Sequence, residues 1–287
     1  GSSASNLTVV NETLFFFATD GTHGAELWKS DGTEAGTVLV KDIQPGPFGS
    51  LSFSNPPVSS GGKLYFLATD KTHGEELWTS DGTEGGTSLV MDIRPGPSDS
   101  FFSQLTPLQG TVVFSASDGA RGTELWRSDG TEAGTYLLAD LRPGSSGSFP
   151  RLIGRAGTFM YFAADFEPYF SHSALMKTDG TAAGTSVVAG TNRLSASVGV
   201  EYQGMLFFTA RDVGNTVELW RSDGTEGGTY PIVTWPAGPN QFVLGSLSEF
   251  TEFQGDLFFT LNPGDSEHVE LWKTHGTWWD TVQVKYL

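Results

Sequence analysis

The sequence predicts an all-β fold, a six-bladed β-propeller with four antiparallel strands in each blade. Three observations carry this prediction. A version of the phrase Glu-Leu-Trp-x-x-Asp-Gly-Thr recurs along the whole 287-residue chain. Short stretches rich in Val, Leu, Phe and Thr alternate with turns that contain Gly, Asp and Ser, as strands do. No segment carries a convincing helical period.

The repeated phrase divides the chain into six units of about 48 residues, which is a typical length for a propeller blade. Counted between the Trp positions, with Met176 as the fourth, the spacings are 50, 48, 50, 44 and 52 residues. Six units use the whole chain, so we expect a single domain over residues 1–287. The copies are Glu26-Leu27-Trp28, Glu76-Leu77-Trp78, Glu124-Leu125-Trp126, the degenerate Ala174-Leu175-Met176, Glu218-Leu219-Trp220 and Glu270-Leu271-Trp272.

Within the third unit we predict four strands, A to D, at residues 104–108, 111–115, 123–127 and 135–141. The chain starts with an A strand near residues 6–10 and stops after a D strand at 282–286. The blade frame therefore coincides with the repeat frame, no strand is exchanged between the termini, and closure would rest on packing of the first and last blades. The predicted blades are approximately 5–46, 47–96, 97–144, 145–192, 193–240 and 241–287.

Composition excludes several classes of partner and site. The chain has 33 acidic and 16 basic residues and a net charge of −17, which repels nucleic acid and anionic membrane surfaces. The absence of Cys excludes disulfides and thiolate sites. No apolar run reaches 18 residues, so we expect no membrane insertion. Gly1-Ser2 resembles the scar that tag removal leaves, and we expect a native signal peptide to have been trimmed.

The recurring residues are best explained as scaffold. Each Trp is expected to pack between adjacent blades, and each preceding Glu to accept hydrogen bonds from neighbouring groups. The Asp-Gly of the phrase suits a C–D hairpin turn. In the Asp-x-Arg-Pro-Gly element, the Asp and Arg are expected to form an ion pair that fixes the loop. This element covers Asp42–Gly46, with Gln in place of Arg, Asp92–Gly96 and Asp140–Gly144.

Strand order assigns the loops to two faces. The A–B and C–D turns lie on one face and are nearly uniform, whereas the B–C and D–A loops lie on the other and vary. Departures from the repeat are concentrated on this variable face, in the B–C loop of blade four and in the D–A loop that starts at Trp235. Aromatic side chains with polar neighbours suit a sugar or peptide site, and the alternative is that these two loops only cover one face of the ring. The predicted ligand-binding residues are Tyr169, Phe170, His172, Trp235, Asn240, Gln241 and Phe242.

A third departure lies in the last C–D turn, on the uniform face. It carries Trp278 and Trp279 where the other copies are polar, and this pair is predicted to bind a partner. The alternative is a local cap near the C-terminus.

Metal and catalytic interpretations have weaker support. His23, His73, His172 and His268 lie in B–C loops, but a propeller separates its blades, so they are not expected to converge on a metal. Calcium is a candidate cofactor without an assigned ligand set. An enzyme would need acidic or amide side chains in the central channel, and the candidates are Glu201, Glu249 and Asn240.

These repeats resemble the bacterial family named for its Glu-Leu-Trp-x-x-Asp-Gly-Thr repeat, and five of the six copies keep Glu-Leu-Trp. The resemblance implies an extracellular or cell-surface protein and supplies no catalytic residues. We therefore expect an extracellular binding module that recognises a glycan or protein through its variable face. The alternatives are a propeller hydrolase or lactonase with a metal or carboxylate site in the channel, and a structural spacer.

Overall fold

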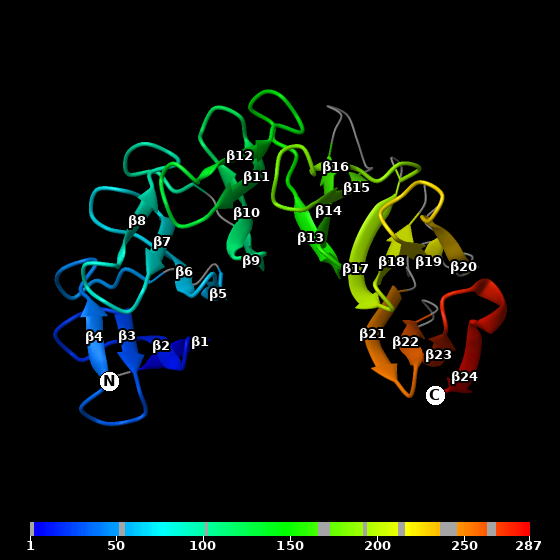
Figure 1. Cartoon of the computed structure of the whole chain (residues 1–287), viewed down its shortest axis with the longest axis horizontal. Helices are drawn as coiled ribbons and strands as arrows, with labels where there is room; N and C mark the ends of the chain where they lie inside the picture. The colour runs from blue at the N-terminus through cyan, green and yellow to red at the C-terminus, as the bar shows by residue number, and fades with distance from the viewer. Residues whose placement is uncertain are drawn as a thin grey trace. The chain divides into compact units, whose positions relative to one another are not determined.

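A computed structural model describes residues 3–51, 55–100, 103–165, 173–191, 194–211, 216–235, 246–262 and 268–287. These residues form 24 strands in six sheets, and each sheet consists of four consecutive antiparallel strands (Figure 1). The helical segment among them is the three-residue 3₁₀ turn η1 (Trp278–Asp280), and within these described residues no helix has the length and apolarity needed to span a bilayer. The predicted four-stranded blades are confirmed.

The chain divides into two compact units of three blades each, Gly1–Pro150 and Arg151–Leu287. The first unit contains β1 (Ala4–Val10), β2 (Thr13–Ala18), β3 (Glu26–Ser30), β4 (Val38–Lys41), β5 (Val58–Ser60), β6 (Lys63–Ala68), β7 (Glu76–Ser80), β8 (Ser88–Met91), β9 (Ser103–Leu108), β10 (Thr111–Ser117), β11 (Thr123–Ser128) and β12 (Tyr136–Ala139).

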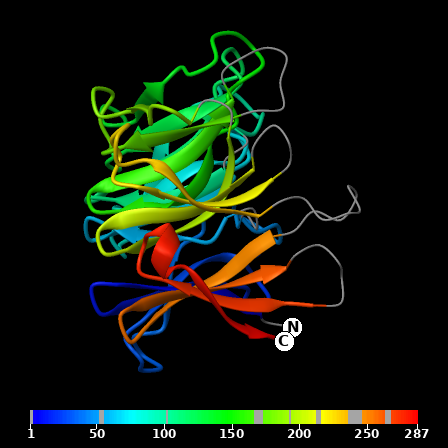
Figure 2. The ribbon, with the colours of Figure 1, turned by 90° about the vertical axis from the view of Figure 1, so that its right-hand side faces the viewer.

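The second unit contains β13 (Arg151–Ala156), β14 (Phe159–Asp165), β15 (Ser173–Thr178), β16 (Ser186–Val187), β17 (Ser195–Tyr202), β18 (Met205–Arg211), β19 (Val217–Ser222), β20 (Tyr230–Trp235), β21 (Ser246–Phe253), β22 (Asp256–Asn262), β23 (Glu270–Thr274) and β24 (Val282–Tyr286). Here the sheet of β21 to β24 lies beside that of β17 to β20 (Figure 2).

Blade and repeat frames coincide as predicted. The first sheet is β1 to β4 and the last is β21 to β24, so neither includes a strand from the other end of the chain. In the third blade, the predicted strands match β9 to β12 within two residues at either end. The A strands of five blades contain β-bulges, and residues with positive φ occupy three of them, namely Asn6, Gln104 and Glu249.

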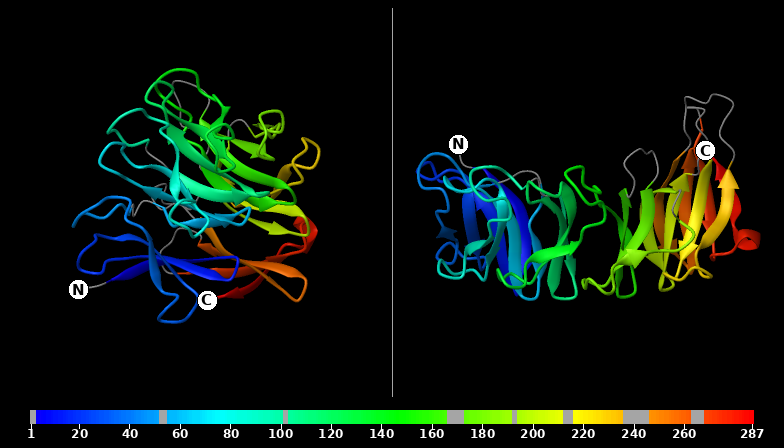
Figure 3. Two further views of the ribbon diagram at one scale, coloured as in Figure 1. Left: turned by 60° about the vertical axis from the view of Figure 1, so that its left-hand side comes forward. Right: turned by 90° about the horizontal axis from the view of Figure 1, so that it is seen from above.

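The cores lie between neighbouring blades because successive side chains of a strand point to opposite faces of its sheet. In the first unit, Phe15 and Phe17 of β2 form one buried cluster with Leu64 and Phe66 of β6. The three sheets of this unit stand side by side in Figure 3. Each central blade therefore contributes one apolar face to the preceding blade and one to the following blade.

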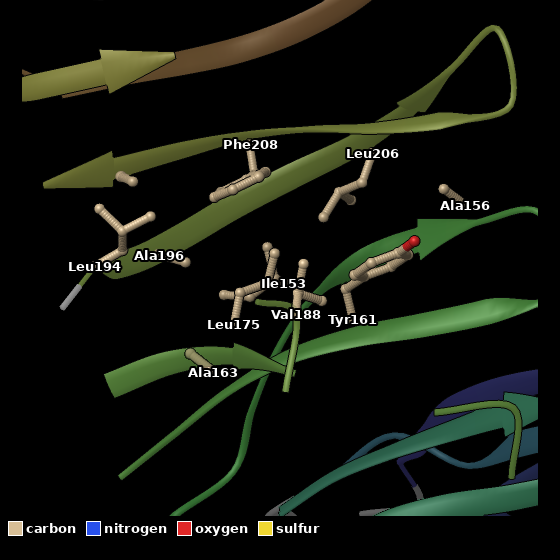
Figure 4. Close-up of a cluster of buried hydrophobic side chains, with 11 residues drawn as sticks. Ile153, Ala156, Tyr161, Ala163, Leu175, Val188, Leu194, Ala196, Leu206 and Phe208 are labelled. Carbon is tan, nitrogen blue, oxygen red and sulfur yellow. The ribbon is translucent and has the colours of Figure 1, made fainter. Parts of the chain in front are cut away.

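The same arrangement recurs in the second unit. Tyr161 and Ala163 of β14 share a buried cluster with Leu206 and Phe208 of β18 (Figure 4). The Trp of the repeated phrase joins these layers as predicted: Trp78 and Trp126 are buried members of clusters in the first unit, while Trp220 and Trp272 pack against clusters in the second.

One hydrogen-bonded turn closes strands C and D in the first five blades. In blade one, the Asp31 carboxylate accepts from Thr33 N and Oγ1 at 2.9 and 2.7 Å. Ser30 and Thr37 hydroxyls bridge its base at 2.7 Å. A Cβ on Gly36 would lie 2.0 Å from the Asp31 carboxylate, which explains the recurring Gly. The Asp residues are turn formers, as predicted.

Candidate functional site

A buried glutamate clamps the loop between blades in the first three blades. The Glu26 carboxylate is fully buried and accepts from Ile43 N at 3.0 Å, from Ser50 N at 3.0 Å and from Ser50 Oγ at 2.6 Å. Glu76 and Glu124 accept equivalent bonds from the loops that contain Ser100 and Ser148. These glutamates therefore act as hydrogen-bond acceptors, as predicted.

Burial dominates the titration of these glutamates. It raises the pKa of Glu76 to about 7 and raises the pKa values of Glu26 and Glu124, while the bonds that they accept act in the opposite direction. Carboxyl groups with shifted pKa values suggest a functional site when they line a cleft. These three are enclosed by the loops that they hold, so we assign them a structural role.

The clamp changes in the second unit. In blade four, Ala174 replaces the glutamate, and the buried Thr191 hydroxyl instead accepts from Leu175 N at 3.1 Å. In blade five, the Glu218 carboxylate accepts from Trp220 Nε1 at 2.8 Å and from Thr234 Oγ1 at 3.3 Å. Among the described residues, the side chains that correspond to this clamp therefore make three different sets of contacts.

In each B–C loop of the first unit, a basic side chain lies between the carboxylates of two aspartates. His23 Nδ1 lies 2.8 Å from Asp20 Oδ2, and its Nε2 lies 3.8 Å from Asp42 Oδ2. His73 lies in the same way between Asp70 and Asp92.

Arg121 takes the same place in blade three, between Asp118 and Asp140. The predicted ion pair within the Asp-x-Arg element is wrong here, because Asp140 pairs with Arg121 across the loops. Arg142 instead donates to the Gly147 carbonyl at 3.3 Å. The sequence placed these residues in neighbouring loops, but the distance between the loops is a tertiary property.

We expect these histidines to make the stability of the first unit depend on pH. The hydrogen bond to Asp20 raises the pKa of His23, and the bond to Asp70 raises the pKa of His73. Asp42 and Glu26 also face His23, while Asp92 and Glu76 face His73. A raised pKa stabilises the fold fully below the unfolded value of about 6.5, and this contribution is lost as pH rises through the folded value.

We therefore expect the melting temperature of the wild type to fall between about pH 6 and pH 8. Replacing both His23 and His73 by Arg, the residue of blade three, should reduce this slope because Arg does not titrate in the range. Thermal unfolding at a series of pH values measures this slope of melting temperature against pH. An unchanged slope in the double variant would show that the histidines do not cause it.

In the last C–D turn, two hydroxyls still bridge the base, but the carboxylate that accepts the turn's hydrogen bonds comes from a different position. Thr274 and Thr281 bridge the base at 2.8 Å, as Ser30 and Thr37 do in blade one. His275 replaces the turn Asp, and Asp280 replaces the recurring Gly. The Asp280 carboxylate accepts from His275 N and Thr277 N at 3.0 and 3.1 Å. The two exchanges compensate, because one carboxylate still holds the turn.

This altered turn presents the two predicted partner-binding residues. Trp278 and Trp279 lie in η1 and are 63% and 70% exposed, with ring centroids 4.7 Å apart. Adjacent exposed apolar side chains form a patch, and such patches mark interaction sites more often than single exposed residues do. The structure thus places this pair on a hydrogen-bonded turn at the surface of blade six.

Trp235 differs from its predicted position. It is the last residue of β20, paired with Val217, and not part of the following loop. Its ring lies 5.3 Å from that of Trp272 and 6.1 Å from that of Phe259, with interplanar angles of 81° and 71°. The half-buried indole is therefore a packing residue at the edge of the core. The other predicted ligand-binding residues, Tyr169, Phe170, His172, Asn240, Gln241 and Phe242, lie outside the described residues.

Two of the three catalytic candidates lie in A strands. Glu201, near the end of β17, is exposed and accepts from Gly157 N at 3.4 Å. Glu249 is exposed at the bulge of β21 with φ 56°, and Asn240 lies outside the described residues. Among the residues that the structure describes, no three His, Asp or Glu side chains gather as a metal site would require.

A small cavity lies between blades five and six, and no prediction from the sequence pointed to it. It measures about 50 Å³ and is lined by Ser197, Thr209, Ala210, Arg211, Val217, Ser246 and Leu247. Burial lowers the pKa of the Arg211 guanidinium. A signal was present in the sequence: the residue after the B-strand Ala or Leu is Thr19, Thr69, Ser117, Asp165 and Asn262 in the other blades, and is cationic only in blade five.

No family model matches the chain, and no curated protein matches it. Several solved structures, in contrast, are similar to the chain. A puromycin hydrolase S511A mutant complexed with PGG shares 16% identity, with a TM-score of 0.50 over 91% of this chain and 42% of its own. Oligopeptidase B from Leishmania major shares 12% identity, with a TM-score of 0.49 over 99% of this chain and 48% of its own.

The chain spans less than half the length of these two structures. At 16% identity the similarity concerns the fold alone. It is a similarity to the β-propeller domain of such enzymes. Together with six blades of four consecutive strands, this similarity shows that the chain has a six-bladed β-propeller fold.

Proposed function

We propose that this chain is a binding module that recognises a glycan or protein ligand through the variable face formed by its B–C and D–A loops. The contrast between the two faces carries the proposal. On the C–D side, five turns repeat one hydrogen-bonded structure, for example Asp31 with Thr33 and Asp223 with Thr225. Their polar groups bond within the turn and leave little chemistry for recognition.

The opposite face varies in length and in the contacts that close it. Buried glutamates close the loops of blades one to three, whereas Thr191 and Glu218 make different contacts in blades four and five. A scaffold position needs the same residue in each blade, but a site for one ligand needs a departure from that symmetry. The loop residues Asn240, Gln241 and Phe242 belong to this proposal as ligand contacts.

A glycan array and a panel of purified extracellular proteins test the proposal on the same preparation. We expect the wild type to bind members of one panel, and substitution of Asn240, Gln241 and Phe242 by Ser to weaken that binding at least tenfold. The control carries Trp278→Ser and Trp279→Ser on the other face and should bind that ligand normally. Absence of binding in both panels would favour a structural spacer.

We propose that the exposed pair Trp278 and Trp279 forms a separate contact with a partner protein. Tryptophan is enriched among residues that dominate binding energy, and these rings are held by a turn whose carboxylate is bonded. A protein that binds the wild type but not the Trp278→Ser, Trp279→Ser variant would support this contact. We also propose an extracellular or cell-surface location, which the family resemblance implies and which fractionation of the source cells tests.

A further inference from the structure

The exposed tryptophan pair of blade six replaces a charged residue of the repeat. Trp278 stands at the position that a glutamate occupies in the turns of blades one, two, three and five. Trp279 is next to it, and Val282, just after the turn, is 43% exposed. Figure 2 shows this turn, in red, at the end of blade six remote from the C-terminus. These three side chains form an apolar patch on an otherwise polar face.

The six C–D turns carry carboxylates and contain no lysine or arginine. Those of blades one, two, three and five each have one Asp and one Glu, and those of blades four and six each have one Asp, together ten of the 33 acidic residues. In the first five blades, bonds from the turn threonine lower the pKa of the turn aspartate, which is therefore charged at neutral pH.

The acidic turn of blade five lies directly beside the patch. Arg221, the residue before that turn, donates to the Gly276 carbonyl of the tryptophan turn at 3.1 Å. A Cβ on Gly276 would lie 3.0 Å from the ring of Phe207, which belongs to blade five. The two turns are therefore neighbours, and blade five brings the exposed Asp223 and Glu226 to the edge of the patch.

Blade six supplies three more carboxylates. Asp280 directly follows the tryptophan pair in the chain. The Tyr202 hydroxyl donates to the Gly255 carbonyl at 2.5 Å, at the residue before Asp256. Burial raises the pKa of Tyr202, and the charges of Glu252, Asp256 and Asp280 raise it further. These three carboxylates therefore lie around one hydroxyl, beside the turn.

The basic side chains of this region already have partners. Lys273 Nζ lies 3.0 Å from Asp256 Oδ2, and His275 Nε2 lies 2.8 Å from Asp256 Oδ1. The Arg221 guanidinium lies over the Tyr230 ring, 5.2 Å from its centroid, in addition to its bond to the tryptophan turn. Five carboxylates thus stand against one lysine, one arginine and one histidine, and the surroundings of the patch are negative.

Exposed indole rings among carboxylates suit a cationic ligand. The face of an indole attracts a guanidinium or ammonium group within about 6 Å of the ring centroid. Arginine suits this surface better than lysine, because its planar guanidinium both stacks on a ring and pairs with a carboxylate. The net charge of −17 attracts basic chains and repels acidic ones.

We propose that the patch of Trp278, Trp279 and Val282 docks an arginine-containing basic segment of a partner protein. The inference rests on the proposed partner contact of this pair and adds the chemistry of the partner. Guanidinium groups stack on the two indole rings, while the exposed carboxylates of Glu226 and Glu252 attract the neighbouring basic side chains.

Short Gly-Ser peptides that carry several Arg, Lys, Gln or Glu residues at the same positions test the proposal on the whole chain. At physiological ionic strength we expect the Arg peptide to bind, the Lys peptide to bind severalfold more weakly, and the Gln and Glu peptides at least tenfold more weakly. Calorimetry measures the affinities. The two indole N–H signals that disappear from the NMR spectrum of the Trp278→Ser, Trp279→Ser variant identify the pair, and they should shift when the Arg peptide is added to the wild type.

The Trp278→Ser, Trp279→Ser variant should bind the Arg peptide about tenfold more weakly, because the stacking contacts are lost. Phe48→Ser is the matched control. It removes a ring that is 69% exposed in the D–A loop after blade one, on the opposite face of the blades, and should bind the peptide like the wild type. Glu226→Gln with Glu252→Gln should weaken binding about threefold. Thermal unfolding checks that each variant is folded.

The proposal is overturned if no peptide binds the wild type, or if the Arg peptide binds the double Trp variant as tightly as the wild type. Equal binding of the Gln and Arg peptides would assign the patch to an uncharged ligand. Self-association that the double Trp variant abolishes would assign it to a second copy. If a partner protein needs the Trp pair but is not displaced by the Arg peptide, the proposed contact stands and this inference fails. Protein panels without a partner, with the Arg peptide bound at the pair, would give the opposite result.

Discussion

Replacing Glu76 by Ala is expected to lower the free energy of unfolding by about 3–5 kcal/mol, the largest stability effect that we predict. The side chain is fully buried, and its carboxylate accepts from Ile93 N at 3.2 Å, from Arg94 N at 3.3 Å and from Ser100 Oγ. Alanine leaves these donors without their acceptor in a dry site, and each such loss costs about 1–3 kcal/mol. Denaturant unfolding measures the change.

Glu218→Ala is the matched control. It is the equivalent residue of blade five, and the bonds that the described residues give its carboxylate come from the side chains of Trp220 and Thr234. We expect a loss of about 1 kcal/mol, since one or two side-chain donors can find other partners. Equal losses in the two variants would contradict the view that backbone clamping makes Glu76 important.

The pH dependence supplies a second readout for Glu76. Burial raises its pKa to about 7, so the folded state retains a proton that the unfolded chain releases near 4.5. Its contribution therefore decreases as pH rises from about 4.5 through about 7, in the same direction as that of the histidines. In Glu76→Ala, part of the decline in stability over this range should disappear.

Gly74→Ala is expected to lower the free energy of unfolding by about 2–3 kcal/mol, or to force the B–C loop of blade two to move. A Cβ at this position would lie 2.4 Å from the Ser98 carbonyl carbon and 2.5 Å from Asp99 N. Both atoms belong to the backbone of the next loop, which the Gly74 N to Gly96 O bond of 3.2 Å holds close. Neither atom can rotate away as a side chain would.

Gly85→Ala serves as control within the same blade. A Cβ there would meet nothing within 4 Å, and its φ is not in the left-handed region. We expect a change within about 0.5 kcal/mol, or slight stabilisation through the unfolded chain. If Gly74→Ala were as stable as Gly85→Ala, the two loops would have to be packed less closely than the structure shows.

The sequence by itself determined the blades. Repeat spacing, turn residues and alternating apolar residues depend on local geometry, so the strands of blade three were predicted within two residues and the blade frame correctly. The turn role of Asp31 and the acceptor role of Glu26 also followed, because a residue that recurs in nearly every blade serves what nearly every blade needs.

Tertiary structure alone decided which groups meet across loops. Asp140 pairs with Arg121, 19 residues earlier in the chain, rather than with its neighbour Arg142, because the B–C and D–A loops approach each other in the folded blade. Trp235 packs into a core where the sequence suggested a loop, since Trp272 of the next blade offers it a partner. The cavity lined by Arg211 lies between strands of blades five and six, and no local pattern encodes how these strands pack.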